Sequence, residues 1–498
     1  MPKPKSLLKE LNVKKKTGAR QAPVTADEFL AVGVEQEEAG EKWRAGDAAK
    51  SMRFFMRAIA TYDEGLKKHP HAFDLAYNKA RVQYEITQHP KLASQLTAPL
   101  ADVLQTTLQS HREALTLDQD NADILFNTAQ VLTSLAEAIT DIKRPADEQL
   151  NQAVKFLQEA LELFQRCLLL QEMRYTEMQE QIRRIEAGEM DTQEFQSTQE
   201  QTDEAVDSKD PEQLEQWAAV VEPVTKNTLV DTAVAQLEAL TTLCNLLTFD
   251  PGVGLAWVEE YSSDLLQEKI TLYVDGSDRC YDASLARAKF VCALSEVLYR
   301  GGRIDIETYH GEIARAFGPD LDISADPDGL CSKADALMSF NTAVTDLPPS
   351  HDPEMLAKSL TLRWQLLSAA LDALTQASKL PEPQNQPKIH LARGDVEMNR
   401  WRLGMPPWEF TVAQQNAAML LRNAQTYYRG AAALARRDGG VEEERDGTCK
   451  EALTAALEGQ KEKLEQLKHS APKELMAVAE DMVEGGWVSA ADMETLLS

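Results

Sequence analysis

Small and large apolar residues recur at helical spacing along much of the chain. From Gly46 to Pro70 the sequence reads GDAAKSMRFFMRAIATYDEGLKKHP, which is a turn, a helical pattern and a proline stop. Ser51, Phe55 and Ala58 share one face of this helix, because residues three and four apart are neighbours on a helix. Two helices approach closely where their contact rows hold small residues. The pattern therefore predicts a helix that packs against an antiparallel partner.

The same pattern recurs in residues 110–132 and 151–164. In the second of these stretches Ala153, Leu157 and Ala160 repeat the order of small, large and small residues. Each stretch is therefore expected to form part of a packed helix pair.

These stretches resemble the tetratricopeptide repeat (TPR) family, whose units of ~34 residues form two antiparallel helices that stack into a superhelix. The family's turn, small and aromatic positions are matched here by Gly46, Asp47, Ser51, Phe55 and Ala58. Asp63 stands where the family has a proline. The resemblance implies an all-α fold, a TPR-like right-handed superhelical solenoid of antiparallel helix pairs.

Other stretches fit the pattern less closely. Residues 120–132 are interpreted as a first helix with Ala129 at its small position, although the spacing would also suit a second helix. The long segment 92–115 extends the second unit beyond one repeat length. Residues 391–404 and 413–435 predict a further pair.

Composition shifts divide the chain into five parts. They are a basic flexible N-terminal arm (1–25), N-terminal TPR-like repeats (26–185), an acidic mobile loop (186–216), C-terminal degenerate repeats (217–470) and short closing helices (471–498). Within the fourth part, residues 436–447 are interpreted as an exposed connector and residues 450–468 as one solvated helix.

The composition is that of a folded helical protein. Of the 498 residues 43% are hydrophobic and 27% charged, while only 6% are aromatic, which favours helix over strand. The six cysteines are scattered without a CxxC pair, as in reduced intracellular proteins. No signal peptide or membrane-spanning run is present. We expect a protein of the cytosol, the nucleus or both, whose oligomeric state the sequence leaves open.

The charge balance favours a basic partner. A formal net charge of −28 would repel nucleic acid from the body of the protein. The N-terminal arm is the exception, with seven lysines and arginines against Glu10. It is interpreted as a nuclear import signal, an RNA contact or a segment that lies against the acidic body.

Catalytic motifs are absent from the sequence. It contains no GxxxxGK[ST], HExxH or GxSxG motif, and its eight histidines have no metal-ligand spacing. We therefore expect no enzyme activity, no metal and no cofactor.

Two asparagines and several acids are candidate peptide-binding residues. Asn78 and Asn127 each lie two residues before a small alanine, and in peptide-binding relatives of the TPR family such asparagines line the groove. An amide there could bond to a client backbone; it could equally satisfy a neighbouring helix. The acids expected to form a groove for a basic segment are Glu35, Glu37, Glu41, Asp74, Glu85 and Asp123.

The sequence argues against a clamp for the C-terminal carboxylate of heat-shock chaperones. That clamp, known in the TPR family, requires lysine or arginine, whereas Glu37, Glu41 and Asp123 occupy would-be clamp positions and would repel an anion. The favoured hypothesis is a non-enzymatic acidic assembly chaperone or adaptor for a basic protein of ribosomal-protein or histone type. A structural subunit of a larger complex and a heat-shock co-chaperone are the alternatives.

Overall fold

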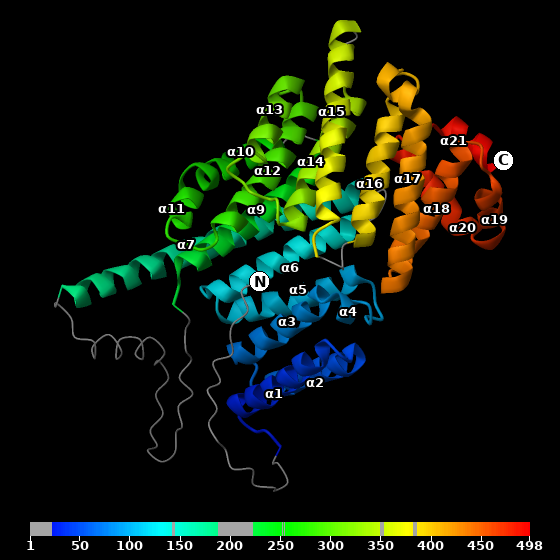
Figure 1. The fold of residues 1–498 in the computed structure, drawn as a ribbon. Helices are drawn as coiled ribbons and strands as arrows, with labels where there is room; N and C mark the ends of the chain where they lie inside the picture. The colour runs from blue at the N-terminus through cyan, green and yellow to red at the C-terminus, as the bar shows by residue number, and fades with distance from the viewer. Residues whose placement is uncertain are drawn as a thin grey trace, which may run out of the picture. The chain divides into compact units, whose positions relative to one another are not determined.

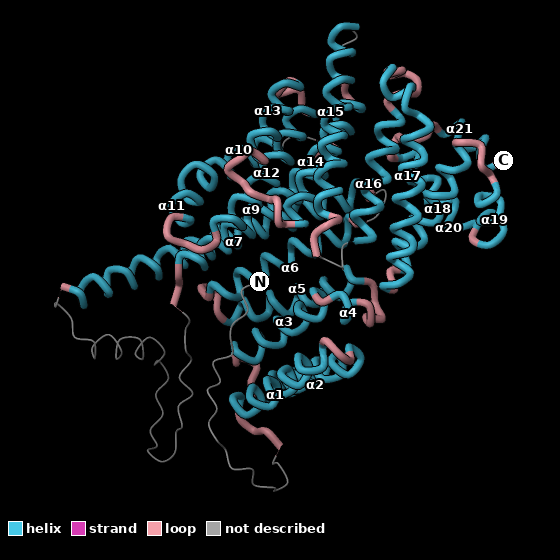
Figure 2. The backbone as a smooth tube through the Cα atoms, in the orientation of Figure 1, coloured by secondary structure: helices cyan, strands magenta, loops and turns pink. Residues whose placement is uncertain are grey.

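The computed structural model is helical throughout the part of the chain that it describes (Figure 1). The described residues are 22–141, 145–187, 223–250, 252, 254–348, 353–381 and 386–498. Among them no strand occurs, and turns join the helices (Figure 2). The all-α expectation is therefore confirmed. Residues 1–21 of the basic arm and residues 188–216 of the acidic loop lie outside the described residues.

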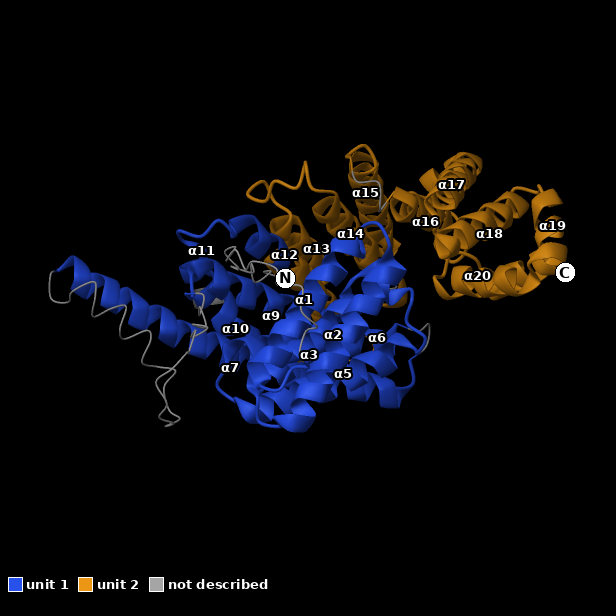
Figure 3. Ribbon diagram, turned by 90° about the horizontal axis from the view of Figure 1, so that it is seen from below, with its two compact units in different colours: residues 1–246, 256–286 blue, residues 247–255, 287–498 orange. Residues whose placement is uncertain are grey.

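The chain divides into two compact units, residues 1–246 with 256–286 and residues 247–255 with 287–498 (Figure 3). The helices of unit 1 are mainly α1 (Ala26–Arg44), α2 (Ala48–Lys68), α3 (Phe73–Gln88), α4 (Pro90–Ala93), α5 (Leu100–Leu117), α6 (Ala122–Thr140), α7 (Asp147–Glu186), α9 (Lys226–Leu247), α10 (Gly254–Asp264), the π-helix η2 (Leu265–Lys269) and α11 (Ile270–Val274). Helix α12 (Cys280–Arg300) spans the boundary between the units.

Unit 2 continues the succession of helices. It contains α13 (Ile306–Ala316), α14 (Pro327–Asp346), α15 (Pro353–Ala377), α16 (Gln386–Arg402), α17 (Thr411–Asp438), α18 (Val441–Leu457), α19 (Glu462–Ser470), α20 (Pro472–Glu484) and α21 (Ala490–Leu497).

Successive helices pack as pairs within each unit. In unit 1, α1 packs against α2, α3 against α5, and α6 against α7; in unit 2, α14 packs against α15 and α16 against α17. The short helix α4 lies between the two members of the second pair, which explains why residues 92–115 exceed one repeat length. Because α6 precedes and packs against α7, residues 120–132 belong to the first helix of a pair.

The contact between α1 and α2 depends on glycines of α1. Ser51 and Phe55 are buried, as their spacing predicts, and the Ser51 hydroxyl donates to the Gly40 carbonyl oxygen at 2.7 Å. A Cβ at Gly40 would lie 3.0 Å from the Phe55 ring, and one at Gly33 would overlap the Tyr62 ring. Both positions therefore exclude a side chain at the closest approach of the two helices.

Unit 2 repeats this arrangement between α16 and α17. A Cβ at Gly394 would overlap the ring of Tyr428, whose hydroxyl donates to Asp395 Oδ1 at 2.8 Å. Lys450 Nζ, from α18, lies 2.8 Å from the same carboxylate oxygen. A buried phenol requires a hydrogen-bond acceptor, and a partly buried carboxylate requires a cation. The close packing of Tyr428 against α16 is therefore accompanied by an ion pair between Asp395 and Lys450 of α18.

The segment around α18 differs from its sequence interpretation. Helix α18 already begins inside the expected connector 436–447 and ends at Leu457, so the expected single helix 450–468 is wrong. A turn with Gly459 at φ +93° separates α18 from α19. Residues 451–456 are buried rather than solvated. Alanine-rich packing explains the error, because small residues pack closely without producing a strongly hydrophobic pattern.

Helix α5 contains a fully buried histidine. The Nδ1 atom of His111 lies 2.9 Å from the Thr107 carbonyl oxygen, and its ring packs edge-on against Tyr84. Its Nε2 atom has no hydrogen-bond partner among the described residues. Burial lowers the pKa of His111 from 6.5 to about 4, because desolvation disfavours the charged imidazolium. His111 is therefore a neutral core residue at pH 7.

We expect the substitution Gly33→Ala to destabilise unit 1 by about 1–3 kcal/mol, because the added methyl group displaces the Tyr62 ring. The matched control is Gly46→Ala, since a Cβ at Gly46 meets no atom within 4 Å. Urea denaturation followed by circular dichroism measures both variants. Equal midpoints for the two variants would show that the glycine contact is unimportant.

Stability should fall in mild acid because of His111. The unfolded chain binds a proton near pH 6.5, whereas the buried ring does so only near pH 4. The contribution of His111 to the free energy of unfolding is therefore complete above pH 6.5. It decreases as the pH falls, and about 2 kcal/mol has been lost at pH 5. The variant His111→Leu should lose less stability between pH 7.5 and pH 5 in urea denaturation. Identical pH dependence in the two proteins would contradict this assignment.

Candidate functional site

Helices α1, α3 and α6, the first members of their pairs, and the following helix α9 contact one another in that order. Arg81 of α3 pairs with Glu37 of α1. On the other side of α3, the Tyr77 hydroxyl oxygen accepts from Asn127 Nδ2 of α6 at 3.1 Å. Glu137 of α6 accepts from the Thr242 hydroxyl of α9 at 3.0 Å. These contacts align the four helices side by side.

We use the term first-helix face for the polar side chains that lie along these contacts. Its members are Glu37, Glu41 and Arg44 on α1, Asp74, Tyr77, Asn78, Arg81 and Glu85 on α3, Asp123, Asn127, Gln130 and Glu137 on α6, and Glu238 and Thr242 on α9. Apart from the adjacent residues Tyr77 and Asn78, successive members on each helix are spaced three, four or seven residues apart, so they share one side of it.

A buried ion cluster joins α1, α2 and α3. The Glu37 side chain, with the residue only 7% exposed, accepts from the Tyr62 hydroxyl and pairs with Arg81. Burial raises the pKa of Glu37, and the positive charge of Arg81 opposes that rise. Arg81 also lies 3.5 Å from Glu85, which pairs with Arg44 at 2.6 Å. The cluster thus holds neighbouring helix pairs together.

Three of the predicted acids are placed differently from the sequence interpretation. Glu37 does not face a client, because Tyr62 and Arg81 enclose its carboxylate. Glu85 is half-buried and pairs with two arginines. Glu35 is exposed, but it lies two residues from Glu37 and hence about 160° around the helix. The sequence pattern of acids could not reveal which of them arginines from other helices neutralise.

The two candidate asparagines occupy equivalent positions on α3 and α6. Asn78 Nδ2 donates to the Asp74 carbonyl oxygen at 2.8 Å, and its Oδ1 atom accepts from Arg81. Asn127 donates to Tyr77. Asn78 thus orients Arg81 within its own helix, and Asn127 orients Tyr77 of the neighbouring helix α3.

Exposed acids remain along the first-helix face. Glu41, Asp74, Asp123 and Glu238 are exposed and come from α1, α3, α6 and α9. Helix α6 has Asp123 and Glu137 and neither lysine nor arginine. This part of the face therefore favours cations over anions.

An aromatic pair lies beside these acids. The rings of Phe73 and Tyr77 stack on α3 with centroids 5.7 Å apart. Burial raises the pKa of Tyr77 to about 12, and the charge of Asp123 contributes to the rise. Rings next to carboxylates can bind a guanidinium or ammonium group. Sequence reasoning missed Tyr77 and Glu238. Tyr77 follows the predicted acid Asp74 by three residues, whereas Glu238 follows no predicted or exposed acid at helical spacing.

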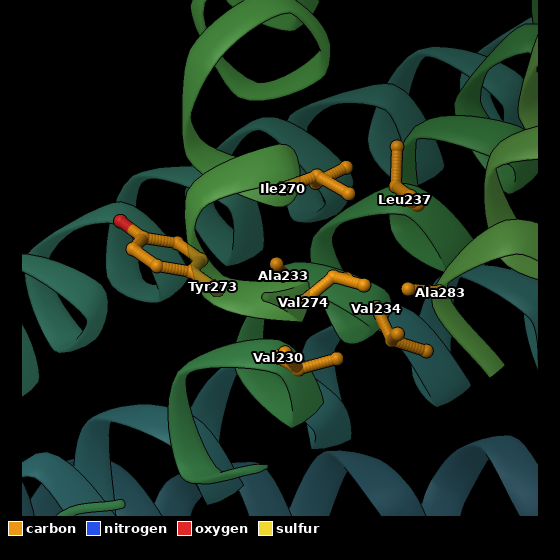
Figure 4. Close-up of a pocket in the computed structure, with 8 residues that line it drawn as sticks. All are labelled: Val230, Ala233, Val234, Leu237, Ile270, Tyr273, Val274 and Ala283. Carbon is orange, nitrogen blue, oxygen red and sulfur yellow. The ribbon is translucent and has the colours of Figure 1, made fainter. Parts of the chain in front are cut away.

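Candidate sites for small-molecule chemistry are sparse. A pocket in unit 1 is lined by Val230, Ala233, Val234, Leu237, Ile270, Tyr273, Val274 and Ala283 (Figure 4). Its only polar group, the Tyr273 hydroxyl, points away from the other lining side chains and donates to Glu172. Across the described ranges, no three His, Cys, Asp or Glu residues are placed to hold a metal ion. In the same ranges, no helix has the length and apolarity required to span a membrane.

The different placements of Glu37 and Glu41 predict different effects of substitution. Glu37→Gln should destabilise unit 1 by about 1–3 kcal/mol, because Arg81 loses its buried counter-ion. Glu41→Gln, on the same helix and exposed, should change the stability by less than about 0.5 kcal/mol. Urea denaturation compares the two proteins. A loss of stability that is equal in both variants would refute the assignment of Glu37 to the core.

Comparison with known proteins gives one similar sequence of comparable length. No protein-family model matches the chain. The UPF0656 protein C926.02 of Schizosaccharomyces pombe is 26% identical over 435 residues, which cover 84% of this chain and 86% of that protein. A solved circular tandem repeat protein with novel repeat topology and enhanced subunit contact surfaces covers 93% of this chain and 99% of its own, at 12% identity. Its TM-score with this chain is 0.29. The similarity to the Schizosaccharomyces pombe protein extends along most of both chains.

Proposed function

We propose that this protein is a non-enzymatic scaffold of the TPR type that binds a basic protein segment along the first-helix face of unit 1. The observation that carries the proposal is the pair of exposed acids Asp74 and Asp123 at the starts of the neighbouring helices α3 and α6, with the exposed acids Glu41 and Glu238 farther along α1 and α9. An assembly chaperone or adaptor of the cytosol or nucleus, with a client of ribosomal-protein or histone type, fits this chemistry best.

Asp74 and Asp123 suit an extended basic segment. The neighbouring helices α3 and α6 lie about 10 Å apart, so the acids at their starts can meet cations spaced three residues apart in an extended chain, which advances about 3.3 Å per residue. Opposite charges accelerate encounter and mask the client's cations, and salt weakens both effects.

Binding of the acidic tail of a heat-shock chaperone is disfavoured by the same charges. The carboxylate of such a tail would approach Asp74 and Asp123, both exposed and both in the first turn of their helices. The cation of this face that lies nearest, Arg81, already pairs with Glu37 and Glu85. A structural subunit of a larger complex is the alternative that the experiment below distinguishes.

We expect a triple variant, Glu41→Lys, Asp74→Lys and Asp123→Lys, to weaken capture of a basic client by at least about tenfold. The matched control is Glu64→Lys, Asp102→Lys and Glu148→Lys, which reverses exposed acids on the second helices α2, α5 and α7. Asp102 and Glu148 occupy first turns, as do Asp74 and Asp123. Each variant therefore changes two helix starts by the same charge. Circular dichroism verifies that both remain folded.

The measurement is affinity purification from native extract at low and moderate salt, with stoichiometry. A small basic protein that is retained by the wild type and the control, and lost from the triple variant and at higher salt, would support the proposal. Retention of several large proteins that resist salt and the triple substitution would contradict it and indicate a structural subunit.

A further inference from the structure

The N-terminal arm has the charge opposite to that of the first-helix face. Residues 1–21 contain Lys3, Lys5, Lys9, Lys14, Lys15, Lys16 and Arg20, with Glu10 as their single acid. The chain as a whole has a formal net charge of −28. The arm therefore has the composition that the proposed function requires of a client.

The point at which the arm leaves unit 1 is well defined. Lys68 Nζ donates to the Pro23 carbonyl oxygen at 3.2 Å, and His69 Nε2 lies 2.8 Å from the Val24 carbonyl oxygen. Both contacts are made by the end of α2, from which a short turn leads to α3. Thr25 then caps α1. The base of the arm, residues 23–25, thus lies beside the beginnings of α1 and α3.

The acids of α3 and α6 lie at this same edge of unit 1. Along α3, Tyr77 and then Tyr84 contact Asn127 and then Ser134 of α6, so the two helices run in the same direction. Their first turns, with Asp74 and Asp123, therefore lie at one edge. Helix α1 is aligned with them, because Glu37 and then Arg44 contact Arg81 and then Glu85.

The arm is long enough to cover the face. Twenty-one extended residues reach up to about 70 Å, whereas four helices packed about 10 Å apart span roughly 30 Å. A tethered segment of this length has an effective concentration on the order of millimolar at a site beside its attachment. Even a weak ionic contact would then be populated.

We propose that residues 1–21 bind to the first-helix face as an intramolecular competitor of the basic client. The inference rests on the proposed function of that face, and it adds a means of regulation. A client must displace the arm, so segments with fewer cations than the arm are excluded while a stronger client binds. The same competition keeps the face covered when no client is present.

The test uses a fluorescent synthetic peptide of residues 1–21 as probe and three forms of the protein. They are the full chain, a chain that begins at residue 22, and a full-length chain whose seven arm lysines and arginines are replaced by glutamine. Fluorescence anisotropy should show that the second and third forms bind the peptide at least about fivefold more tightly than the full chain at low salt. Binding should weaken as salt is added.

Charge reversal locates the contact. In the chain that begins at residue 22, Asp74→Lys with Asp123→Lys should weaken peptide binding by about tenfold. Asp102→Lys with Glu148→Lys on the second helices should leave it within about twofold. Absence of peptide binding, equal affinity of all three forms, or equal effects of the two double substitutions would overturn the inference.

The inference and the proposed function can fail separately. Peptide binding that follows the expected pattern, without any basic protein retained from extract, would support the arm contact and refute the client. Retention of a basic client in equal amounts by the full chain and the chain that begins at residue 22, with no peptide binding, would refute the arm contact alone.

Discussion

The closest helix contacts in this protein require a position without a side chain, and Gly33 and Gly394 provide it under the rings of Tyr62 and Tyr428. Each ring places its hydroxyl against a carboxylate of the first helix. A cation from a third helix, Arg81 of α3 or Lys450 of α18, balances that carboxylate. The glycine that admits each tyrosine ring inside a helix pair therefore also leads to an ion pair with a helix outside that pair.

This link divides the acids of unit 1 into two groups. Glu37 and Glu85 are neutralised by Arg81 and Arg44 and stabilise the packing of α1 against α3. Asp74 and Asp123 are exposed at the helix starts, where they create the potential that a basic segment would meet. Acids so similar in sequence therefore differ in role, because only a buried carboxylate loses its hydration and depends on a partner.

Local spacing predicted more of the fold than of the site. The positions of Ser51 and Phe55 predicted the buried face of α2, because the spacing of small and large residues along a helix indicates which side packs against its partner. The core position of Glu37 was not predictable in this way, since Tyr62 and Arg81 reach it from other helices. Likewise, the alanine-rich sequence of residues 451–456 has the pattern of an exposed helix. In the structure these residues are buried, and their helix packs against α17.

The two kinds of contact in unit 1 differ in stiffness. Inside the pair of α1 and α2, Gly40 and Phe55 meet at van der Waals distance, which allows almost no displacement. Between first helices, the polar contacts of Arg44 with Glu85 and of Asn127 with Tyr77 tolerate small rotations at little energetic cost, because side-chain torsions can adjust. Leu75 and Val82 of α3 belong to the same apolar core cluster as Phe29 and Phe55, so neighbouring pairs stay packed together even where added salt weakens their ion pairs.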